Sequence, residues 1–261
     1  MKLLRDIEKK LPDAYKLIII ALIVTALLNA SSFGYDRVIL SGILAVIIAQ
    51  AFDIGITYIK TKKIIYGDSA TIAALIIANI IMPGQYLLIG AVSAISMLLK
   101  HIIRFEKKPI FNPASLGMFS AIILLSATGV LTTGEQFLLG WGNSSLQNLI
   151  GTGALVILGL LVAIKIKRIT ASVTYLITYT ITIFLMAGTA GLAYFPFFGA
   201  FFMVTEPRTS PTKTKHQIIF GVAAWVLGII YSMFILNPFH AFSLGFLSAN
   251  GLKIVLEKIN I

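Results

Sequence analysis

The chain has 261 residues, of which 58% are hydrophobic and only 12% are charged. Soluble domains average roughly 45–50% apolar and 25% charged residues, so the composition excludes an ordinary soluble fold and predicts an all-α integral membrane protein. Cysteine is absent, which excludes disulfides, thiolate metal sites and iron–sulfur ligation by this chain. The net charge is +11, but the basic residues flank apolar runs, a pattern that favours membrane topology over binding of nucleic acid.

Apolar runs recur along the whole chain, and about 20 apolar residues cross a bilayer. The predicted spans, in chain order, are residues 15–29, 38–59, 69–82, 86–103, 113–130, 149–164, 171–192, 195–205, 217–236 and 239–256. The spans 69–82 and 195–205 are too short to cross as straight helices, and each ends just before a proline, Pro83 or Pro207. Short, broken helices at matching places in two halves are typical of transporter binding sites.

The positions of lysine and arginine predict the orientation. With the N-terminus inside, 20 of the 21 basic residues fall on inner segments and only Arg37 falls outside, while the longest outer loop, 131–148, has none. We interpret the basic residues 1–10 as a cytoplasmic anchor, because no small-residue cleavage site typical of a signal peptide follows them. The positive-inside rule therefore predicts about ten spans, a multi-pass protein of the cell membrane and both termini in the cytoplasm.

Two parts of the sequence share a pattern, an Asn-Pro pair followed by a Ser-Leu-Gly piece. The copies are Asn112-Pro113 with Ser115-Leu116-Gly117, and Asn237-Pro238 with Ser243-Leu244-Gly245. The Ser-Leu-Gly pieces lie 128 residues apart, and the prolines that end the short spans precede the two asparagines by 29 and 30 residues. Each half holds five spans, an odd number, so the second half must be upside down. We predict one membrane domain, 1–261, with inverted repeats at about 15–130 and about 149–258.

Polar residues at the short spans are the candidate binding residues, since ionisable groups inside a bilayer are costly and usually functional. Asp68 and Ser69 begin the first short span, where a carboxylate can cap free N–H groups and can also contact a ligand. Glu206 follows Thr205 at the end of the second short span, where a negative charge opposes the helix dipole. It therefore predicts an ion pair with Arg208 or a lysine, or a bound cation.

Three further positions carry polar groups. Asn112 and Asn237, each before a proline, are good helix starts and could also direct polar groups into a central cavity. Asp53, late in the second span, is interpreted as a charge near the inner surface, with a functional role as the alternative. The three histidines are too scattered to indicate a metal site, and no phosphate-binding loop, dinucleotide fingerprint or serine-hydrolase elbow is present.

We expect these polar groups to converge from both halves on one cavity. The expected lining residues are Ser69, Asn112, Thr205, Thr209 and Asn237, with Asp68 and Glu206 nearer the rims. Irregular backbone at membrane depth survives only where protein encloses it or where it lines a wet cavity. The alternative is that these residues cap separate helices and never meet.

The sequence from Asp68 to the C-terminus resembles a known family. The runs that carry the resemblance are Asp68-Ser69-Ala70, Phe111-Asn112-Pro113-Ala114 and residues 198–212, which end in Thr-Glu-Pro-Arg-Thr-Ser-Pro-Thr. They are similar to the RnfD/NqrB family, whose members are membrane subunits of the Rnf electron-transport complex and of the sodium-pumping NADH:quinone reductase. The resemblance implies ten helices in two inverted repeats, a fold shared with urea channels.

The chain departs from that family at its flavin motif. Members of the family carry FMN covalently on the last threonine of a Ser/Thr-Gly-Ala-Thr motif, and the nearest match here is Thr152-Gly153-Ala154-Leu155. Leu155 has no hydroxyl to esterify, and Glu206 replaces the usual aspartate. The resemblance then implies FMN or riboflavin held non-covalently, if at all. The residues expected to contact it are Asp68, Ser69, Asn112, Pro113, Thr205, Glu206, Thr209 and Asn237.

Two functions remain open. The first is a membrane subunit of an ion-translocating electron-transport complex, not catalytic by itself, whose partner subunits in the membrane carry the iron–sulfur centres. The second is a stand-alone channel or carrier for a small solute that uses the same cavity without redox chemistry. The Thr-Glu-Pro-Arg-Thr-Ser-Pro motif favours the first, and the missing acceptor threonine favours the second.

Overall fold

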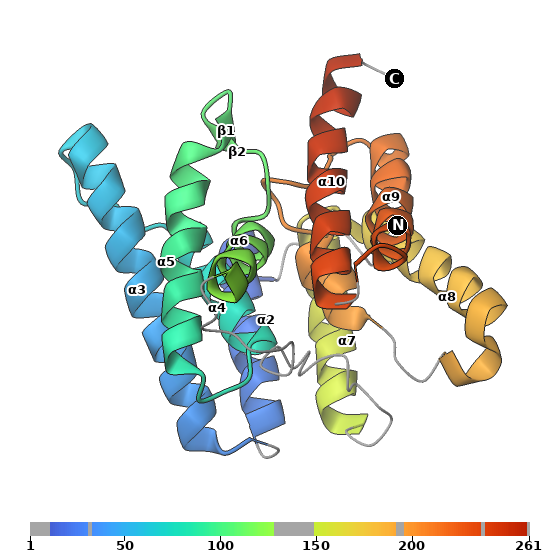
Figure 1. Cartoon of the computed structure of the whole chain (residues 1–261), viewed down its shortest axis with the longest axis horizontal. Helices are drawn as coiled ribbons and strands as arrows, with labels where there is room; N and C mark the ends of the chain where they lie inside the picture. Colours follow the sequence, from blue (N-terminus) through green and yellow to red (C-terminus); the bar gives the residue numbers. More distant parts are fainter. Residues whose placement is uncertain (1–10, 31–32, 128–148, 192–195, 236–237, 260–261) are drawn as a thin grey trace.

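The computed structural model is mostly helical and describes residues 11–30, 33–127, 149–191, 196–235 and 238–259 (Figure 1). Its helices are α2 (Ala14–Asn29), α3 (Tyr35–Thr61), α4 (Asp68–Ile80), α5 (Tyr86–Ile102), α6 (Pro113–Ala127), α7 (Leu149–Lys165), α8 (Ile169–Gly191), the π-helix η4 (Gly199–Met203), α9 (Thr214–Ser232) and α10 (Pro238–Ile259). Two short antiparallel strands, β1 (Arg104–Phe105) and β2 (Lys108–Pro109), form a hairpin between α5 and α6. Each predicted apolar span therefore contains a helix, which confirms the helical fold class.

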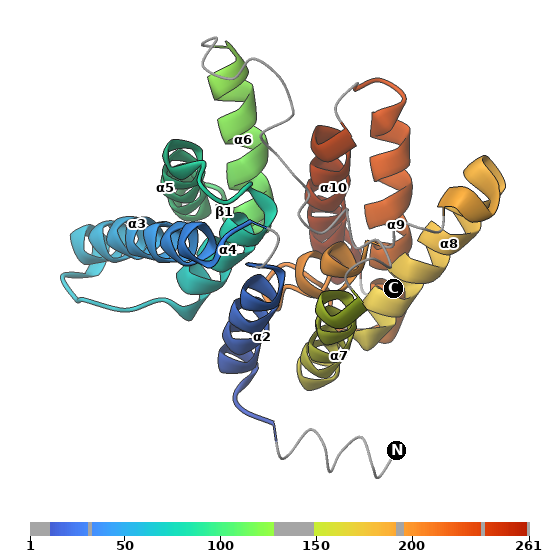
Figure 2. The same ribbon diagram turned by 90° about the horizontal axis from the view of Figure 1, so that it is seen from below.

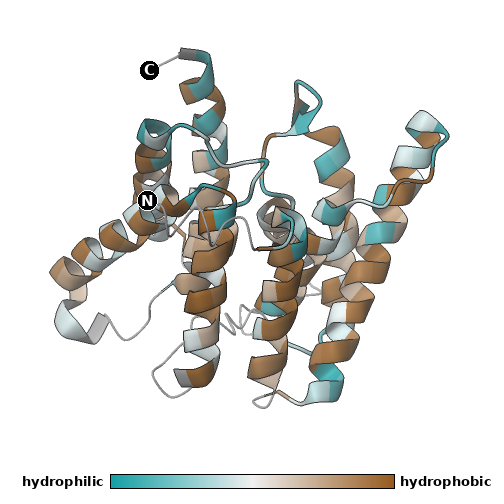
Figure 3. Ribbon diagram, turned by 180° about the vertical axis from the view of Figure 1, so that it is seen from behind, coloured by the Kyte–Doolittle hydropathy of each residue, from teal (hydrophilic) through white to brown (hydrophobic). Residues whose placement is uncertain are grey.

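Three helices are long and apolar enough to cross a membrane: α3, α8 over Ile169–Thr189, and α9. Their surfaces have the opposite polarity to those of a water-soluble bundle. On α3, Ile43 is 50% and Ile47 61% exposed, whereas Ser41 on the same helix is fully buried. Figure 3 shows hydrophobic residues along the lengths of the helices and hydrophilic ones mostly at their ends and in the connections. Apolar side chains on the outside and small polar ones between helices are what a lipid environment favours.

The basic segments gather on one side of the molecule. The end of α3, the β1–β2 hairpin and the end of α10 lie together at the top of Figure 1, while the start of α3 and the turn between α4 and α5 lie at the bottom. The top segments carry Lys62, Lys107 and Lys258, and Arg37 lies near the bottom, in the first turns of α3. This distribution agrees with the expected basic inner side. The predicted outer loop 131–148 lies outside the described residues.

The two halves of the chain use the same packing pairs. In the first half, α3 packs against α4 and α5, and α5 packs against α6; in the second, α8 packs against η4 and α9, and α9 packs against α10. Between the halves, α2 contacts α7 and α6 contacts α10. Figure 2 shows these two contacts where the halves meet.

Glycines set the closest helix approaches at corresponding positions of the halves. A Cβ on Gly117 in α6 would lie 2.7 Å from the Cα of Ser96 in α5, and a Cβ on Gly245 in α10 would lie 2.7 Å from the carbonyl oxygen of Ala224 in α9. Both the glycines and their partners are 128 residues apart in the sequence. Small residues let helix backbones approach closely in membrane bundles.

We predict that Gly245→Ala destabilises the protein, because the added methyl group meets backbone atoms of α9 that cannot rotate away. Overpacking of this kind costs about 1–3 kcal/mol and would appear as a lower melting temperature in detergent. Gly55→Ala is the matched control, since a Cβ there has nothing within 4 Å and alanine is the better helix former. Equal melting temperatures for the two variants would contradict the close packing.

We also predict that the ends of α3 lie on opposite sides of the membrane. The chain has no cysteine, so Asp36→Cys and Lys62→Cys each introduce a single thiol at an exposed position. A membrane-impermeant maleimide applied to intact cells should label only the first variant, and lysed membranes should label both. Labelling of both variants in intact cells would show that α3 does not cross.

Candidate functional site

The loop between η4 and α9 is organised around the carboxylate of Glu206. Its Oε2 accepts hydrogen bonds from the backbone N–H of Arg208 at 3.1 Å, from the backbone N–H of Thr209 at 2.7 Å and from the Thr209 hydroxyl at 2.6 Å. The Ser210 hydroxyl donates to the backbone carbonyl of Glu206 at 2.8 Å. Glu206 therefore caps the turn that follows it, and the side-chain ion pair expected with Arg208 or a lysine is wrong for the described residues. Its charge meets free N–H groups rather than the C-terminal end of a helix dipole.

The side-chain amide of Asn250 joins this loop to the start of α6. Its Oδ1 accepts from the backbone N–H of Asn112 at 2.9 Å, and its Nδ2 donates to the backbone carbonyl of Thr209 at 3.3 Å. Asn250 lies in α10 and is 1% exposed. One side chain from the second half thus holds two of the predicted site residues, Asn112 and Thr209, in one hydrogen-bonded group. We call Asn112, Glu206, Thr209 and Asn250 the central junction.

Asn112 also begins its helix as predicted. Its Oδ1 accepts from the backbone N–H of Ala114 at 2.9 Å and from that of Ser115 at 3.3 Å, and Pro113 is the first residue of α6. Proline has no N–H to satisfy and its fixed φ suits this position. Capping and participation in the central junction therefore coexist at Asn112. The asparagine of the second Asn-Pro pair, Asn237, lies outside the described residues.

The remaining predicted residues lie apart from these hydrogen bonds. Asp68 is exposed and is the first residue of α4, where Gly67 takes the N-cap position without any side-chain cap; the capping role predicted for Asp68 is wrong. Ser69 is buried in the first turn of α4, and its hydroxyl has no hydrogen-bond partner among the described residues. The Thr205 hydroxyl donates to the backbone carbonyl of Phe201.

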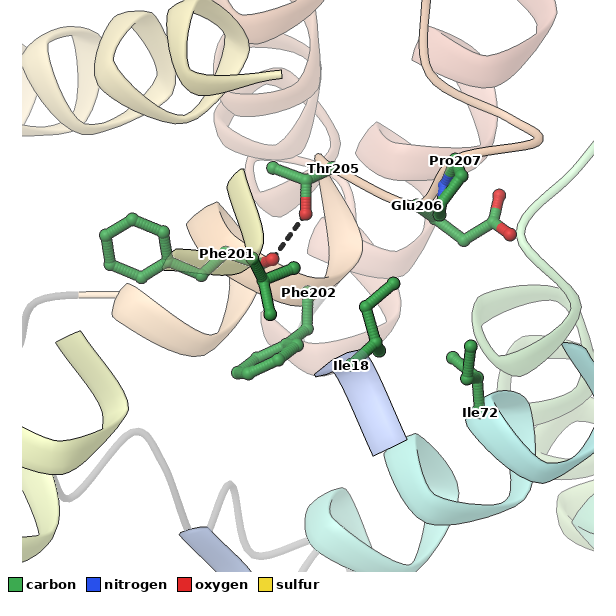
Figure 4. Close-up of a pocket in the computed structure, with 8 residues that line it drawn as sticks. Ile18, Ile72, Phe201, Phe202, Thr205, Glu206 and Pro207 are labelled. Atoms are coloured by element: carbon green, nitrogen blue, oxygen red, sulfur yellow. Dashed lines mark hydrogen bonds between the residues drawn. The ribbon is translucent and has the colours of Figure 1, made fainter. Parts of the chain in front are cut away.

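A narrow gap lies beside the central junction (Figure 4). Its lining residues are Ile18, Ile72, Val162, Phe201, Phe202, Thr205, Glu206 and Pro207. The empty space at the gap, open solvent included, is about 190 Å³. Pockets for organic ligands are roughly 300–1,000 Å³, so this gap is smaller than a ligand pocket. Leu155, which stands at the expected flavin acceptor position, is fully buried in α7.

A buried arginine lies under the same loop. The Arg168 Nε donates to the Ser210 hydroxyl at 3.1 Å, and its Nη1 donates to the backbone carbonyl of Ile166 at 3.2 Å. Burial lowers the pKa of this guanidinium, and the charges of Glu257 and Glu206 oppose that effect. Arginine nevertheless keeps its proton in proteins, so Arg168 places a fixed positive charge beside the loop.

A separate ionic cluster joins α3 to α5. Asp53 Oδ1 lies 2.8 Å from Lys100 Nζ and 2.7 Å from His101 Nε2. Asp53 is 5% exposed, so its charge is buried between α3 and α5 and paired there with basic side chains. One signal of the pairing was available in the sequence, because Asp53 and Lys100 both stand inside apolar runs where an unpaired charge is costly.

No protein-family model matches this sequence, and no curated protein matches it either. The chain is thus defined by its own structure as a helical protein in which three helices are long and apolar enough to cross a membrane. Its distinctive internal features are the central junction and the Asp53 cluster.

We predict that Glu206→Ala destabilises the fold, because it leaves the Thr209 N–H and hydroxyl buried without an acceptor. An unsatisfied buried polar group costs about 1–3 kcal/mol, which thermal unfolding in detergent would detect. Glu257→Ala is the control. That carboxylate is 43% exposed and forms an ion pair with Lys253 at 3.6 Å, and such surface pairs contribute little to stability. Equal melting temperatures for Glu206→Ala and Glu257→Ala would contradict the role of Glu206 in organising the loop.

Proposed function

We propose that this chain is a membrane subunit of an ion-translocating electron-transport complex of the Rnf and sodium-pumping NADH:quinone reductase type. One observation carries the proposal. The segments on which the family resemblance rests, Asn112-Pro113 and the loop 205–212, are far apart in the sequence, yet both belong to the central junction through Asn250. These residues carry the sequence motif and also join the two halves of the chain. Such a role is suited to the rigid part of a transport protein.

We propose further that the frame has ten membrane-embedded segments in two inverted halves. The matched packing pairs, the α2–α7 and α6–α10 contacts between corresponding helices, and the paired approaches at Gly117 and Gly245 support this repeat. The gathering of basic segments at one end of the bundle supports the inside-to-outside orientation. In this arrangement α4 and η4 are the two short broken elements, and both termini are cytoplasmic.

The redox chemistry belongs to partner subunits in this proposal. The chain has no cysteine, so iron–sulfur centres must be held elsewhere. The gap beside Glu206 is smaller than a ligand pocket, and we assign no electron-transfer step to this chain. FMN or riboflavin, where one is bound, is held without a covalent bond, because Leu155 stands at the acceptor position.

The second candidate is a stand-alone channel or carrier for a small solute. The observation in its favour is Leu155, which is fully buried among apolar side chains and leaves the chain without the cofactor attachment that the family uses. A carrier of this kind would work without redox partners. The two candidates therefore differ in whether redox subunits copurify with the protein.

We predict that the tagged chain, purified in mild detergent from its source cells, brings with it subunits that contain iron–sulfur centres and shows no fluorescent flavin band after denaturing electrophoresis. Mass spectrometry and the visible absorbance spectrum provide the two measurements. A fluorescent band that disappears in Thr152→Ala would show a covalent flavin on the Thr152 hydroxyl. If the chain purified without redox subunits and carried a solute across liposome membranes, the electron-transport function would be rejected in favour of the channel or carrier.

A further inference from the structure

The cluster of Asp53, Lys100 and His101 contains two basic groups but only one carboxylate. The side chains of the three residues are 7%, 4% and 9% exposed. One carboxylate oxygen, Oδ1, faces both Lys100 Nζ and His101 Nε2. A single negative charge thus stands against two basic groups, and one of these, the ammonium of Lys100, already balances it.

The hydrogen bonds fix which nitrogen of His101 is free to take a proton. An ionised carboxylate only accepts hydrogen bonds, so Nε2 must carry the hydrogen that points to Asp53. Nδ1 of the neutral ring then presents a lone pair, and this atom is buried with no hydrogen-bond partner among the described residues. A proton on Nδ1 converts the ring to an imidazolium whose Nε2 lies 2.7 Å from the carboxylate, and the attraction between these opposite charges favours the protonated ring.

The start of α4 helps Asp53 to stay ionised. A Cβ on Gly67 would lie only 2.3 Å from Asp53 Oδ2, so the glycine lets the carboxylate reach the N-terminal end of this helix. Helix N-termini favour negative charge. Gln50 holds this end of α4 against α3, because its Nε2 donates to the Gly67 carbonyl at 3.0 Å and to the Thr71 hydroxyl at 2.7 Å.

The other charged groups around the cluster are mainly positive. Lys60 of α3 donates to the backbone carbonyl of His101 at 3.4 Å, and the charges of Arg208 and Arg104 act on Lys100. Asp68 of α4 is exposed, and α6 has no ionisable residue. Among the described residues, Asp53 is therefore the carboxylate in contact with the imidazole, and the buried ammonium of Lys100 on the same carboxylate oxygen limits how readily the imidazole holds its proton.

We propose that Asp53, Lys100 and His101 form a proton-binding site between α3 and α5, in which the His101 ring takes up and releases the proton beside the carboxylate of Asp53. Histidine is suited to this role because its charge changes between about pH 5 and 8. The cluster lies near the basic end of the bundle, where the exposed Lys60 reaches the His101 carbonyl, so protons exchange with that side. The three residues of the site belong to α3 and α5, and the site does not depend on the electron-transport proposal.

The test follows the ring nitrogens of His101 in the full-length protein in lipid nanodiscs, labelled with 15N-histidine, as the pH is changed. The His101 signals are identified by their loss in His101→Gln. We expect reversible ring protonation. Asp53→Asn should weaken proton binding by about tenfold or more, since an opposite charge within hydrogen-bond distance has been removed. Lys100→Met should strengthen it, since a like charge has been removed.

Lys60→Gln is the matched control, because it removes an exposed positive charge that meets His101 at its backbone carbonyl and not at its ring. It should leave proton binding nearly unchanged, since solvent screens exposed charges. If Asp53→Asn fails to fold, Lys100→Met alone decides, because that variant retains the pairing of Asp53 with His101. A His101 ring that does not titrate between about pH 5 and 9, or one that titrates identically in the wild type and in Lys100→Met, would overturn the proposal.

Discussion

The hydrogen bonds of the Asn250 side chain are the interaction on which the centre of the molecule depends. A carboxamide can accept and donate at its two ends at once, and Asn250 does both, to the backbones of Asn112 and Thr209. Aspartate could make only the first bond and leucine neither. Burial makes this requirement strict, because an unpaired polar group away from water is costly.

The irregular segment between η4 and α9 exists because side chains replace the backbone partners that a helix would provide. Glu206 accepts from two N–H groups of the loop. Gln217, in the first turn of α9, donates from one amide nitrogen to the backbone carbonyls of Lys167 and Thr212, both at 2.9 Å. These side chains satisfy backbone groups that have no partner in a helix or strand. The hydrogen bonds of these polar side chains are therefore sufficient to account for the conformation of the loop.

The features that are predictable from the sequence are those with a local cause. Apolar runs indicate the helices, and the Asn-Pro pair indicates the start of α6. The role of Asn250 is not predictable in this way, because a single asparagine in an apolar helix has no partner at a recognisable spacing. The contact between Asp53 and Lys100 joins residues 47 apart in the sequence, on helices whose relative rotation no periodicity reveals. Glu206 is expected from the sequence to end a helix, whereas the chain reverses there and presents new N–H donors.

The length of α4 has a consequence for how the protein is made. Its 13 residues span about 20 Å at 1.5 Å per residue, well short of the roughly 30 Å hydrocarbon core. In the proposed membrane arrangement, such a segment does not cross the bilayer as an independent unit. Its place is then provided by its neighbours, because Gln50 of α3 and the packed faces of α3 and α5 receive it. That arrangement implies an order of biogenesis, in which the long helix α3 is inserted before α4 is fitted beside it.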